Sequence, residues 1–480
     1  MNNRMVRFLL ISLLLTTCLT ITAQKNFVNS YGFHGYNKGI DIVHHTNGYL
    51  VGGNSSDQPG QTQIYLVKIN NQGETLWDLS YFKNNITTLH QLKLFSPDSI
   101  VLAGSRHASN NDEYEYFVSM VDSSGNIYWE ESFGGEGWQQ ISSLRLHNNK
   151  IIAGGYTLID SIGYYQPVIL KINNAGTIVS KYQLASSSSK KIHSIDMIGD
   201  SVILAAGALV NDTTNKKNGY FVLLDTNLNI LTDSVLTDTV ENELFFAQWN
   251  DPFIVAGGYQ TINQKAKQNW HIMINPFTPK QRSFIGSRVN DNIFTDMTIT
   301  RNDNFYFTGF IESFGGGNKD ILISIHNKNG YWKDSYTKGS SEDETGNSII
   351  TDDSNRIIIC GTSNSWGPDF SNIFVFHGDS ANKNVNYQDH YTDIHVSQKS
   401  GNINVYPNPF SSQLNIRQDT PFRQQGQKQN IYIYDIRGKL VFREKLNLNV
   451  NQIINLDNLE PGLYILEIPE ITFRKKIIKQ

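Results

Sequence analysis

The residues of this sequence whose types could bind a metal or act in catalysis do not form a recognisable metal site or catalytic motif. His44 and His45 are adjacent in an alternating run, so their rings point to opposite faces of a strand and diverge. Asp352–Asn355 resembles part of a calcium loop, but it lacks the Gly and the distal Glu of an EF-hand and fits an Asx turn. Cys360 lies in an apolar run, which predicts a buried and inert thiol. We therefore predict no metal, no cofactor and no catalytic residue.

Carboxylates on predicted loops are a second source of chemistry, because a converging pair can act as general acid and base. The loop carboxylates are Asp112, Glu113, Glu136, Glu312 and Asp343. Solvated charge is the simplest interpretation of each. The sequence has no nucleophile elbow, and Gly315–Gly317 is not followed by the Lys-Ser/Thr of a phosphate-binding loop. A catalytic function therefore has no motif to support it.

Aromatic side chains stand beside polar ones in loops that the predicted fold brings to one face. Such residues suit recognition of sugars or protein surfaces, and binding residues concentrate on loops held by a rigid scaffold. The candidate ligand-binding residues are Arg106, His107, Trp138, Tyr164, Tyr165, Tyr259, Phe314, Trp366 and Phe370, with His34 and Tyr36 on the same face. The alternative is that several of these aromatics pack under their own loops.

A sequence repeat with a period near 52 residues positions these loops. An apolar pair followed by Gly recurs, and its glycines are Gly52, Gly104, Gly154, Gly207, Gly257, Gly309 and Gly361. Each copy contains four short strand-like runs separated by turn residues, and no helical period is found. Such units indicate a radial stack of antiparallel sheets. We predict an all-β fold in which residues 24–379 form a seven-bladed β-propeller.

The predicted ring is closed by the N-terminus of the mature chain. The seventh copy has three strands, which end near Ile373–Phe376, and its fourth strand is weak. The segment Phe27–Gly32 reads like the fourth strands of other copies, so we expect it to complete this sheet and remove an exposed edge. The turn Asp122–Trp129 resembles pyrroloquinoline-quinone repeats and sialidase Asp-boxes only loosely. We interpret it as shared hairpin geometry, with Trp as a filler between units.

The N-terminus and the composition indicate export. Arg4 and Arg7 precede the apolar run Phe8–Leu15, which predicts a signal peptide over residues 1–23, cleaved after Ala23 or, alternatively, Gln24. Cys18 raises a lipoprotein alternative that the preceding Thr17 makes less favourable. We predict no transmembrane segment in the mature protein. The net charge of −4 argues against a nucleic-acid partner, and two cysteines in 480 residues exclude a disulfide scaffold.

The C-terminus follows a different pattern. A polar linker is predicted over residues 380–401, and alternating runs in residues 402–480 indicate a small immunoglobulin-like β-sandwich. Four motifs occur there in order: Tyr406-Pro407-Asn408-Pro409, Tyr434-Asp435-Ile436-Arg437-Gly438-Lys439, Pro461-Gly462-Leu463-Tyr464 and the basic run Arg474–Lys479. This segment resembles the type A C-terminal sorting domain of the type IX secretion system of Bacteroidetes. The repeats also resemble those of secreted Bacteroidetes proteins.

The resemblance implies a route and partners. A family member crosses the inner membrane through its signal peptide and the outer membrane through the type IX machinery. A sortase-like protease then removes the sorting domain, and the cargo is released or attached to lipopolysaccharide. We therefore expect an extracellular or outer-membrane-surface protein. The preferred function is a non-catalytic propeller that binds a glycan or protein. The alternatives are a carbohydrate-active hydrolase or lyase, and a structural adhesin component.

Overall fold

The computed structural model describes most of the propeller and sandwich sequence. The described residues are 26–32, 35–56, 61–82, 86–107, 113–135, 137–159, 163–183, 188–211, 213–236, 240–262, 266–278, 281–286, 290–313, 315, 318–367, 370–378, 403–418, 428–435, 439–447, 451–468 and 473–480. Every regular element among them is a strand. The predicted signal peptide, the predicted linker, His34, Asp112, Glu136 and Phe314 lie outside the described residues.

Strands β1–β28 follow the predicted repeat. Unit 1 contains β2 (Tyr36–His45), β3 (Gly48–Ser56), β4 (Gln63–Asn70) and β5 (Thr75–Tyr81). Unit 2 contains β6 (Thr87–Ser96), β7 (Ser99–His107), β8 (Tyr114–Asp122) and β9 (Ile127–Phe133). Unit 3 contains β10 (Trp138–His147), β11 (Lys150–Ile159), β12 (Tyr164–Ile172) and β13 (Ile178–Gln183). Unit 4 contains β14 (Ser189–Ile198), β15 (Val202–Val210), β16 (Lys217–Asp225) and β17 (Ile230–Val235).

The remaining repeats have the same order. Unit 5 contains β18 (Asn242–Asn250), β19 (Phe253–Ile262), β20 (Ala266–Ile274) and β21 (Gln281–Ile285). Unit 6 contains β22 (Asn292–Ile299), β23 (Phe305–Ile311), β24 (Asp320–His326) and β25 (Trp332–Lys338). The closing unit contains β26 (Glu344–Thr351), β27 (Ile357–Ser363), β28 (Asn372–Gly378) and β1 (Phe27–Tyr31).

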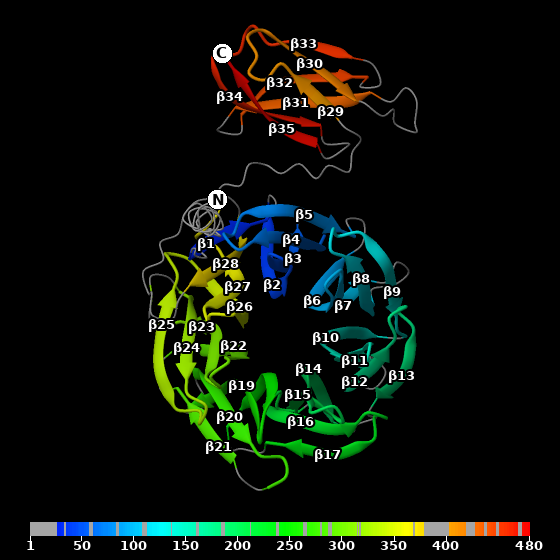
Figure 1. Ribbon diagram of the computed structural model, residues 1–480, viewed down its shortest axis with the longest axis vertical. Coiled ribbons are helices and arrows are strands. Elements are labelled where there is room, and N and C mark those ends of the chain that lie inside the picture. The colour runs from blue at the N-terminus through cyan, green and yellow to red at the C-terminus, as the bar shows by residue number, and fades with distance from the viewer. Residues whose placement is uncertain are drawn as a thin grey trace, which may run out of the picture.

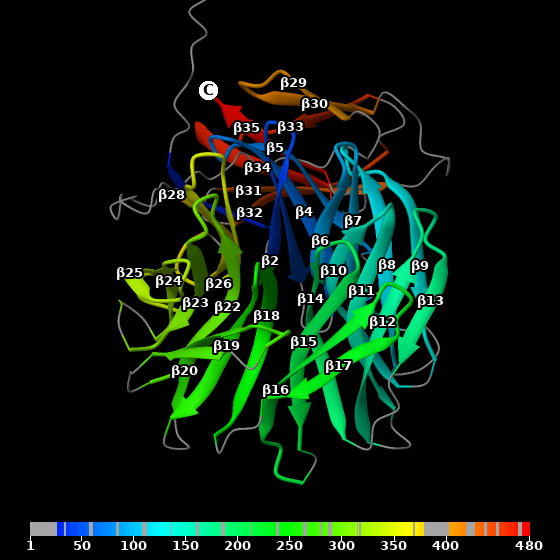
Figure 2. The ribbon, with the colours of Figure 1, turned by 60° about the horizontal axis from the view of Figure 1, so that its bottom comes forward.

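These units form a ring around a central opening (Figure 1). Among the described residues, five of the units are separate four-stranded sheets, and units 2 and 3 are joined into one eight-stranded sheet by a single residue pair. Within a unit each strand pairs antiparallel with the next one. First strands such as β2, β6, β10 and β14 face the opening, and fourth strands such as β5, β9, β13 and β17 lie at the rim (Figures 1 and 2). The predicted β-propeller fold is confirmed.

The N-terminal strand closes the ring as predicted. Strand β1 pairs antiparallel with β28, from Phe27 opposite His377 to Tyr31 opposite Ile373. The Tyr31 hydroxyl and the Asn29 amide both donate to the carbonyl oxygen of Gly73 in unit 1, at 2.7 Å and 2.9 Å. The closing strand therefore bonds to its own sheet and to the neighbouring unit.

The apolar core lies between successive units, and the repeated Gly and Trp residues serve that packing. A Cβ atom at Gly104 would lie 1.8 Å from the carbonyl oxygen of Thr88, so only glycine allows this approach of β7 to β6. Trp129 donates from Nε1 to the carbonyl oxygen of Asn174 in the next unit, at 2.8 Å. Cys360 is fully buried, and burial raises the pKa of its thiol well above the usual value.

The hairpins between third and fourth strands share one turn. In unit 2 the Asp122 carboxylate accepts hydrogen bonds from the main-chain amides of Ser124 and Asn126, at 2.8 Å and 2.7 Å. Asn173 and Asp225 make the same pair of bonds in units 3 and 4. The turn is therefore a recurring Asx turn, which accounts for its likeness to an Asp-box without a ligand.

A set of hydrogen bonds links the first strands around the channel. Each first strand contains a β-bulge. The side chain just after the bulge then bonds to the neighbouring unit, usually to a main-chain amide. The pairs are Asp41 with Leu92 N (3.1 Å), Gln91 with Leu144 N (2.5 Å), Ser143 with Ile195 N (3.0 Å), Ser194 with Ala247 N (3.0 Å), Asp296 with Ile349 N (2.9 Å) and Ser348 with the Asp41 carboxylate (2.7 Å). We call this set the channel hydrogen-bond ring. Unit 5 has Phe246 at this position, and its side chain packs against Phe307 of unit 6 instead.

The C-terminal segment folds as the predicted immunoglobulin-like sandwich. One sheet contains β29 (Ile403–Tyr406), β30 (Gln413–Gln418) and β33 (Gln452–Asn455). The other contains β32 (Leu440–Leu446), β31 (Gln429–Asp435), β34 (Gly462–Ile468) and β35 (Phe473–Lys479). Leu414 and Ile416 of the first sheet share one buried core with Ile431 and Leu466 of the second. This apolar alternation explains why the motif-bearing runs form strands.

Candidate functional site

The predicted loop residues that the structure describes come from one end of the strands. In each unit, the second and fourth strands end at this face and the first and third strands begin there. Arg106 and His107 end β7, Trp138 begins β10, and Tyr164 and Tyr165 begin β12. Tyr259 lies near the end of β19, and Trp366 and Phe370 lie between β27 and β28. We call this end of the propeller the loop face.

The first exposed aromatic pair joins units 2 and 3. Trp138 and Tyr114 form the single parallel residue pair that connects the two sheets. Their rings are 4.8 Å apart, and Trp138 remains 55% exposed. His107 packs its edge against Tyr114 at 5.3 Å. The pair therefore offers a supported aromatic surface to solvent. Tyr114 was not among the predicted residues, because its contact with Trp138 crosses a unit boundary.

A second pair occupies the equivalent place between the closing unit and unit 1. Tyr36 and Phe370 are stacked with ring centres 5.2 Å apart, and the two side chains are 50% and 73% exposed. Beside them, the main-chain amide of Asn37 donates to the carbonyl oxygen of Ser371 at 3.1 Å. Since a first strand begins against the start of the preceding third strand at both junctions, the repeat itself creates these two aromatic pairs.

Two predicted residues are held inside the protein and do not form an exposed surface. The Arg106 guanidinium lies over the rings of Phe82 and Phe117 and pairs with Glu130 at 3.1 Å. Tyr259 is 1% exposed, and its hydroxyl donates to the Glu241 carboxylate at 2.5 Å. These contacts leave the Arg106 and Tyr259 side chains less accessible than the exposed aromatics of the same face.

The other predicted aromatics are partly covered. Lys191 places its ammonium group 3.6 Å from the centre of the Tyr165 ring, and Tyr156 packs edge-on against the same ring. Trp366 is half-buried against Phe374, with ring centres 5.2 Å apart. Tyr164 is also half-buried. The structure therefore does not gather the predicted residues into one site. It separates them among several junctions of the same face.

A buried ionic cluster lies beside Lys191 and was not predicted. Glu243 accepts from His193 at 3.1 Å and from Lys217 at 2.7 Å, and it is buried. Burial alone would raise the pKa of Glu243, but the bond and charge of His193, together with Lys217, lower that pKa to about 2. The three residues come from units 4 and 5, so the cluster fixes one junction.

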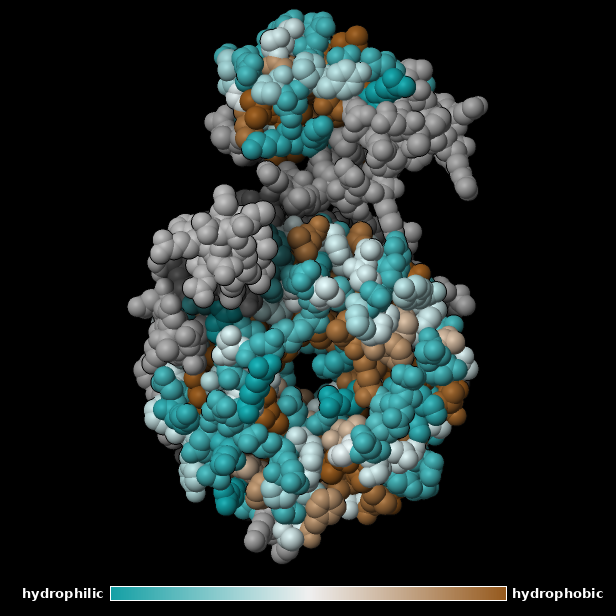
Figure 3. All heavy atoms as spheres, viewed as in Figure 1, coloured by the Kyte–Doolittle hydropathy of each residue, from teal (hydrophilic) through white to brown (hydrophobic). Residues whose placement is uncertain are grey.

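Carboxylates near the channel are also bound to the scaffold. Asp41 accepts bonds from Leu92 and Ser348, and Asp296 accepts from the main-chain amides of Met297 and Ile349. Burial and the nearby Asp41 charge raise the pKa of Asp296 to about 7. Figure 3 shows hydrophilic residues around the central opening. These polar groups join neighbouring units, and this role accounts for their position.

The two sequence motifs considered as possible metal sites, Asp352–Asn355 and His44–His45, lie in ordinary structural positions. The Asp352 carboxylate accepts from the amides of Ser354 and Arg356, at 2.8 Å and 2.9 Å, which is the predicted Asx turn. His44 bonds to the carbonyl oxygen of Thr351, whereas His45 is buried. Within the described ranges, no three His, Cys, Asp or Glu residues form a group that could hold a metal ion. No helix among these residues has the length and hydropathy needed to cross a bilayer.

Comparison with known proteins gives one family match. Residues 404–480 match the secretion system C-terminal sorting domain, which agrees with the resemblance found in the sequence and implies export. No curated protein matches this chain.

The solved structures that resemble this chain include three with low sequence identity to it. Sqt1 from Chaetomium thermophilum is 12% identical, with 71% of this chain and 83% of that chain covered and a TM-score of 0.43. The β-propeller domain of the Trilobed protease from Pyrococcus furiosus is 10% identical, with 72% and 94% covered and a TM-score of 0.39. The acylaminoacyl peptidase of Pyrococcus horikoshii is 11% identical, with 82% and 59% covered and a TM-score of 0.44.

Proposed function

We propose that this protein is a secreted or cell-surface, non-catalytic β-propeller that binds a glycan through its loop face. The observation that carries the proposal is the presence of two exposed aromatic pairs, the tilted pair Tyr114–Trp138 and the stacked pair Tyr36–Phe370. An exposed ring face provides a flat apolar surface for the C–H groups of a sugar ring, and neighbouring polar groups can bind its hydroxyls. Rigid strands on either side hold each aromatic pair before any ligand binds, which lowers the entropic cost of binding.

Binding of the mature chain, residues 24–480, to an array of plant, microbial and host glycans tests this proposal. Trp138→Ala and Phe370→Ala should each weaken retention on the bound glycan. Phe277→Ala is the matched control, because Phe277 is 68% exposed but lies in the hairpin between β20 and β21, at the opposite end of the strands. The proposal fails if no glycan is retained, or if the control variant loses as much binding as the two loop-face variants.

We also propose how the chain is exported. The sorting domain supports recognition by the type IX machinery, and a sortase would cleave within residues 380–401, leaving the propeller outside the cell or on the outer-membrane surface. The sandwich has its own buried core, which supports independent folding. Removal of residues 402–480 should therefore trap a folded propeller in the periplasm of the native host. Mass spectrometry of exported material should find a C-terminus within residues 380–401. Surface delivery of the truncated chain would contradict this route.

A further inference from the structure

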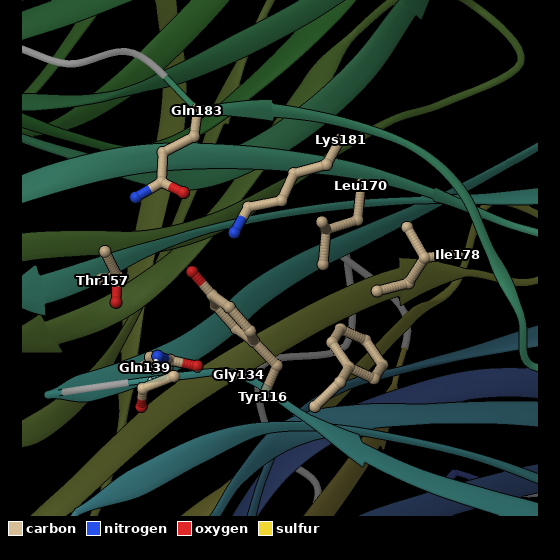
Figure 4. Close-up of a pocket in the computed structure, with 10 residues that line it drawn as sticks. Tyr116, Gly134, Gln139, Thr157, Leu170, Ile178, Lys181 and Gln183 are labelled. Atoms are coloured by element: carbon tan, nitrogen blue, oxygen red, sulfur yellow. Dashed lines mark hydrogen bonds between the residues drawn. The ribbon is translucent and has the colours of Figure 1, made fainter.

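A pocket lies between units 2 and 3, separate from the exposed aromatic pairs. Its volume is about 420 Å³, and its lining comes from β8, the end of β9, and all four strands of unit 3. Phe133 lines the pocket together with Leu170 and Ile178, and these three supply apolar walls. Tyr116, Thr157 and Lys181 supply polar groups (Figure 4). This volume lies within the range of natural small-ligand sites, roughly 300–1,000 Å³.

Two buried hydroxyl groups in this pocket have no hydrogen bond among the described residues. Tyr116 and Thr157 are each 2% exposed, and neither side-chain oxygen meets the geometry of a hydrogen bond to the protein. Burial raises the pKa of Tyr116, and the nearby Thr157 hydroxyl offsets only part of that rise, so Tyr116 stays a neutral donor. Buried polar groups are nearly always paired, so a ligand that bonds to both neighbouring hydroxyls would satisfy them better than they satisfy each other.

The repeat shows how other units treat the equivalent side chain. In unit 4 it is Tyr220, whose buried hydroxyl also makes no hydrogen bond of good geometry, but burial and the nearby Asp233 of the adjacent fourth strand raise its pKa. In unit 1 the equivalent residue is Tyr65, and its hydroxyl donates to Asp78 of the adjacent fourth strand at 2.9 Å. In unit 5 it is Trp270, which donates to Ser283 at 2.7 Å. The strand registers place Glu131 of unit 2 at the position of Asp78 in unit 1 and Ser283 in unit 5, but the Glu131 side chain is exposed. Unit 2 therefore lacks the internal acceptor, and the Tyr116 hydroxyl points into the pocket (Figure 4).

A cation stands at the mouth of the pocket. Lys181 extends from β13 with its amino group directed toward the Tyr116 hydroxyl (Figure 4). In the described part of the chain, no carboxylate forms an ion pair with Lys181. Partial burial lowers the pKa of this amine. A bound anion would raise the pKa of the Lys181 amine again, because an opposite charge at short range favours the protonated amine.

We propose that this pocket binds a small ligand carrying a carboxylate on a ring-sized body. The carboxylate accepts from Lys181, Tyr116 and Thr157, and the body packs against Phe133, Leu170 and Ile178. A sugar acid and a simple aromatic acid share this chemistry. The proposal does not depend on glycan binding by the exposed aromatic pairs, because it uses different residues.

Calorimetric titration of the mature full-length chain with galacturonate, benzoate and galactose tests the proposal. We expect at least one of the two acids to bind and neutral galactose to bind at least tenfold more weakly. Binding of galacturonate alone identifies a sugar acid, and binding of benzoate alone identifies an aromatic acid. Failure of both acids, or equal binding of galactose, overturns the proposal.

Variants separate a binding role from a structural one. Lys181→Met should weaken acid binding by roughly tenfold or more, the effect expected for loss of a charge-assisted bond. Tyr116→Phe should weaken it by about fivefold to tenfold without lowering the melting temperature. Tyr65→Phe is the matched control: it should lower the melting temperature, because Asp78 loses a partner, and leave acid affinity unchanged. The proposal is overturned if Lys181→Met binds normally, or if Tyr116→Phe destabilises the protein as much as Tyr65→Phe.

A blocking variant gives a second readout. Gly135 lines the pocket, and a Cβ atom there would meet no heavy atom within 4 Å. Gly135→Leu should therefore fold normally and exclude the acid. Retained acid binding in this variant would contradict the proposed location. Glycan binding by the Trp138 surface would be measured separately, so failure of one proposal leaves the other standing.

Discussion

The channel hydrogen-bond ring and the loop face use their side chains in opposite ways. In the channel hydrogen-bond ring, Asp41, Ser143 and Asp296 each accept a hydrogen bond from the main chain of a neighbouring unit. On the loop face, Trp138 and Phe370 leave more than half of their surface in solvent. Polar residues near the channel therefore hold the ring together, whereas the aromatics at these two junctions are exposed to solvent. Four experiments test this distinction.

Deletion of residues 26–32 should have the largest effect. It removes β1 and with it the buried side chains of Phe27, Val28 and Tyr31, and it exposes the edge of β28. Loss of three buried side chains corresponds to roughly 5–9 kcal/mol at about 1.5–3 kcal/mol each. Chemical denaturation and size-exclusion chromatography should show an unfolded or aggregated protein. Deletion of residues 24–25 alone keeps β1 and serves as the control. Equal stability of the two truncated chains would contradict closure by this strand.

Asp41→Ala should cost about 2–4 kcal/mol of unfolding free energy, because it leaves the amide of Leu92 and the hydroxyl of Ser348 without their acceptor. Denaturant titration measures the loss. Asp353→Ala is the control, since the side chain of Asp353 is 94% exposed and should change stability by less than about 0.5 kcal/mol. A similar loss of unfolding free energy in Asp41→Ala and Asp353→Ala would contradict a structural role for the channel hydrogen-bond ring.

Acid should destabilise the propeller through His271. Burial, together with the neighbouring His326, lowers the folded-state pKa of His271 well below 6.5. The unfolded chain therefore takes up a proton first as the pH falls, so this contribution is complete above about pH 6.5 and is lost below it. His271→Phe should flatten the fall in stability between pH 6.5 and 4.5. Phe284→Leu disturbs the same ring stack without removing a titrating group, so its pH profile should stay parallel to that of the parent.

The smallest stability effect is expected on the loop face. Trp138→Ala and Phe370→Ala remove exposed side chains, so each should change the unfolding free energy by less than about 0.5 kcal/mol. Their effects should add in the double variant, because the two residues lie at different junctions. A loss above about 1 kcal/mol in either variant would mean that the aromatic pair is part of the scaffold, and the proposed binding surface would lose its support.

Local sequence patterns predicted the fold well because each unit repeats the same strands and turns. The closure by Phe27–Tyr31 was predicted because that segment resembles other fourth strands. The exposure of the candidate ligand-binding residues was harder to predict, since it depends on partners in other strands and in neighbouring units. Nothing near Arg106 in the sequence signals that Phe82 packs against its guanidinium. The Tyr116 pocket was missed because its walls come from two units, and only the contrast with Tyr65 makes it evident.

The pairing of Phe27 with His377 encloses 377 − 27 = 350 residues. Loop-closure entropy grows only with the logarithm of length, so joining these ends costs roughly 1.7 kcal/mol more than joining two positions about 52 residues apart. The bonds and buried side chains of β1 exceed that difference. The size of the enclosed loop therefore adds little to the cost of closure.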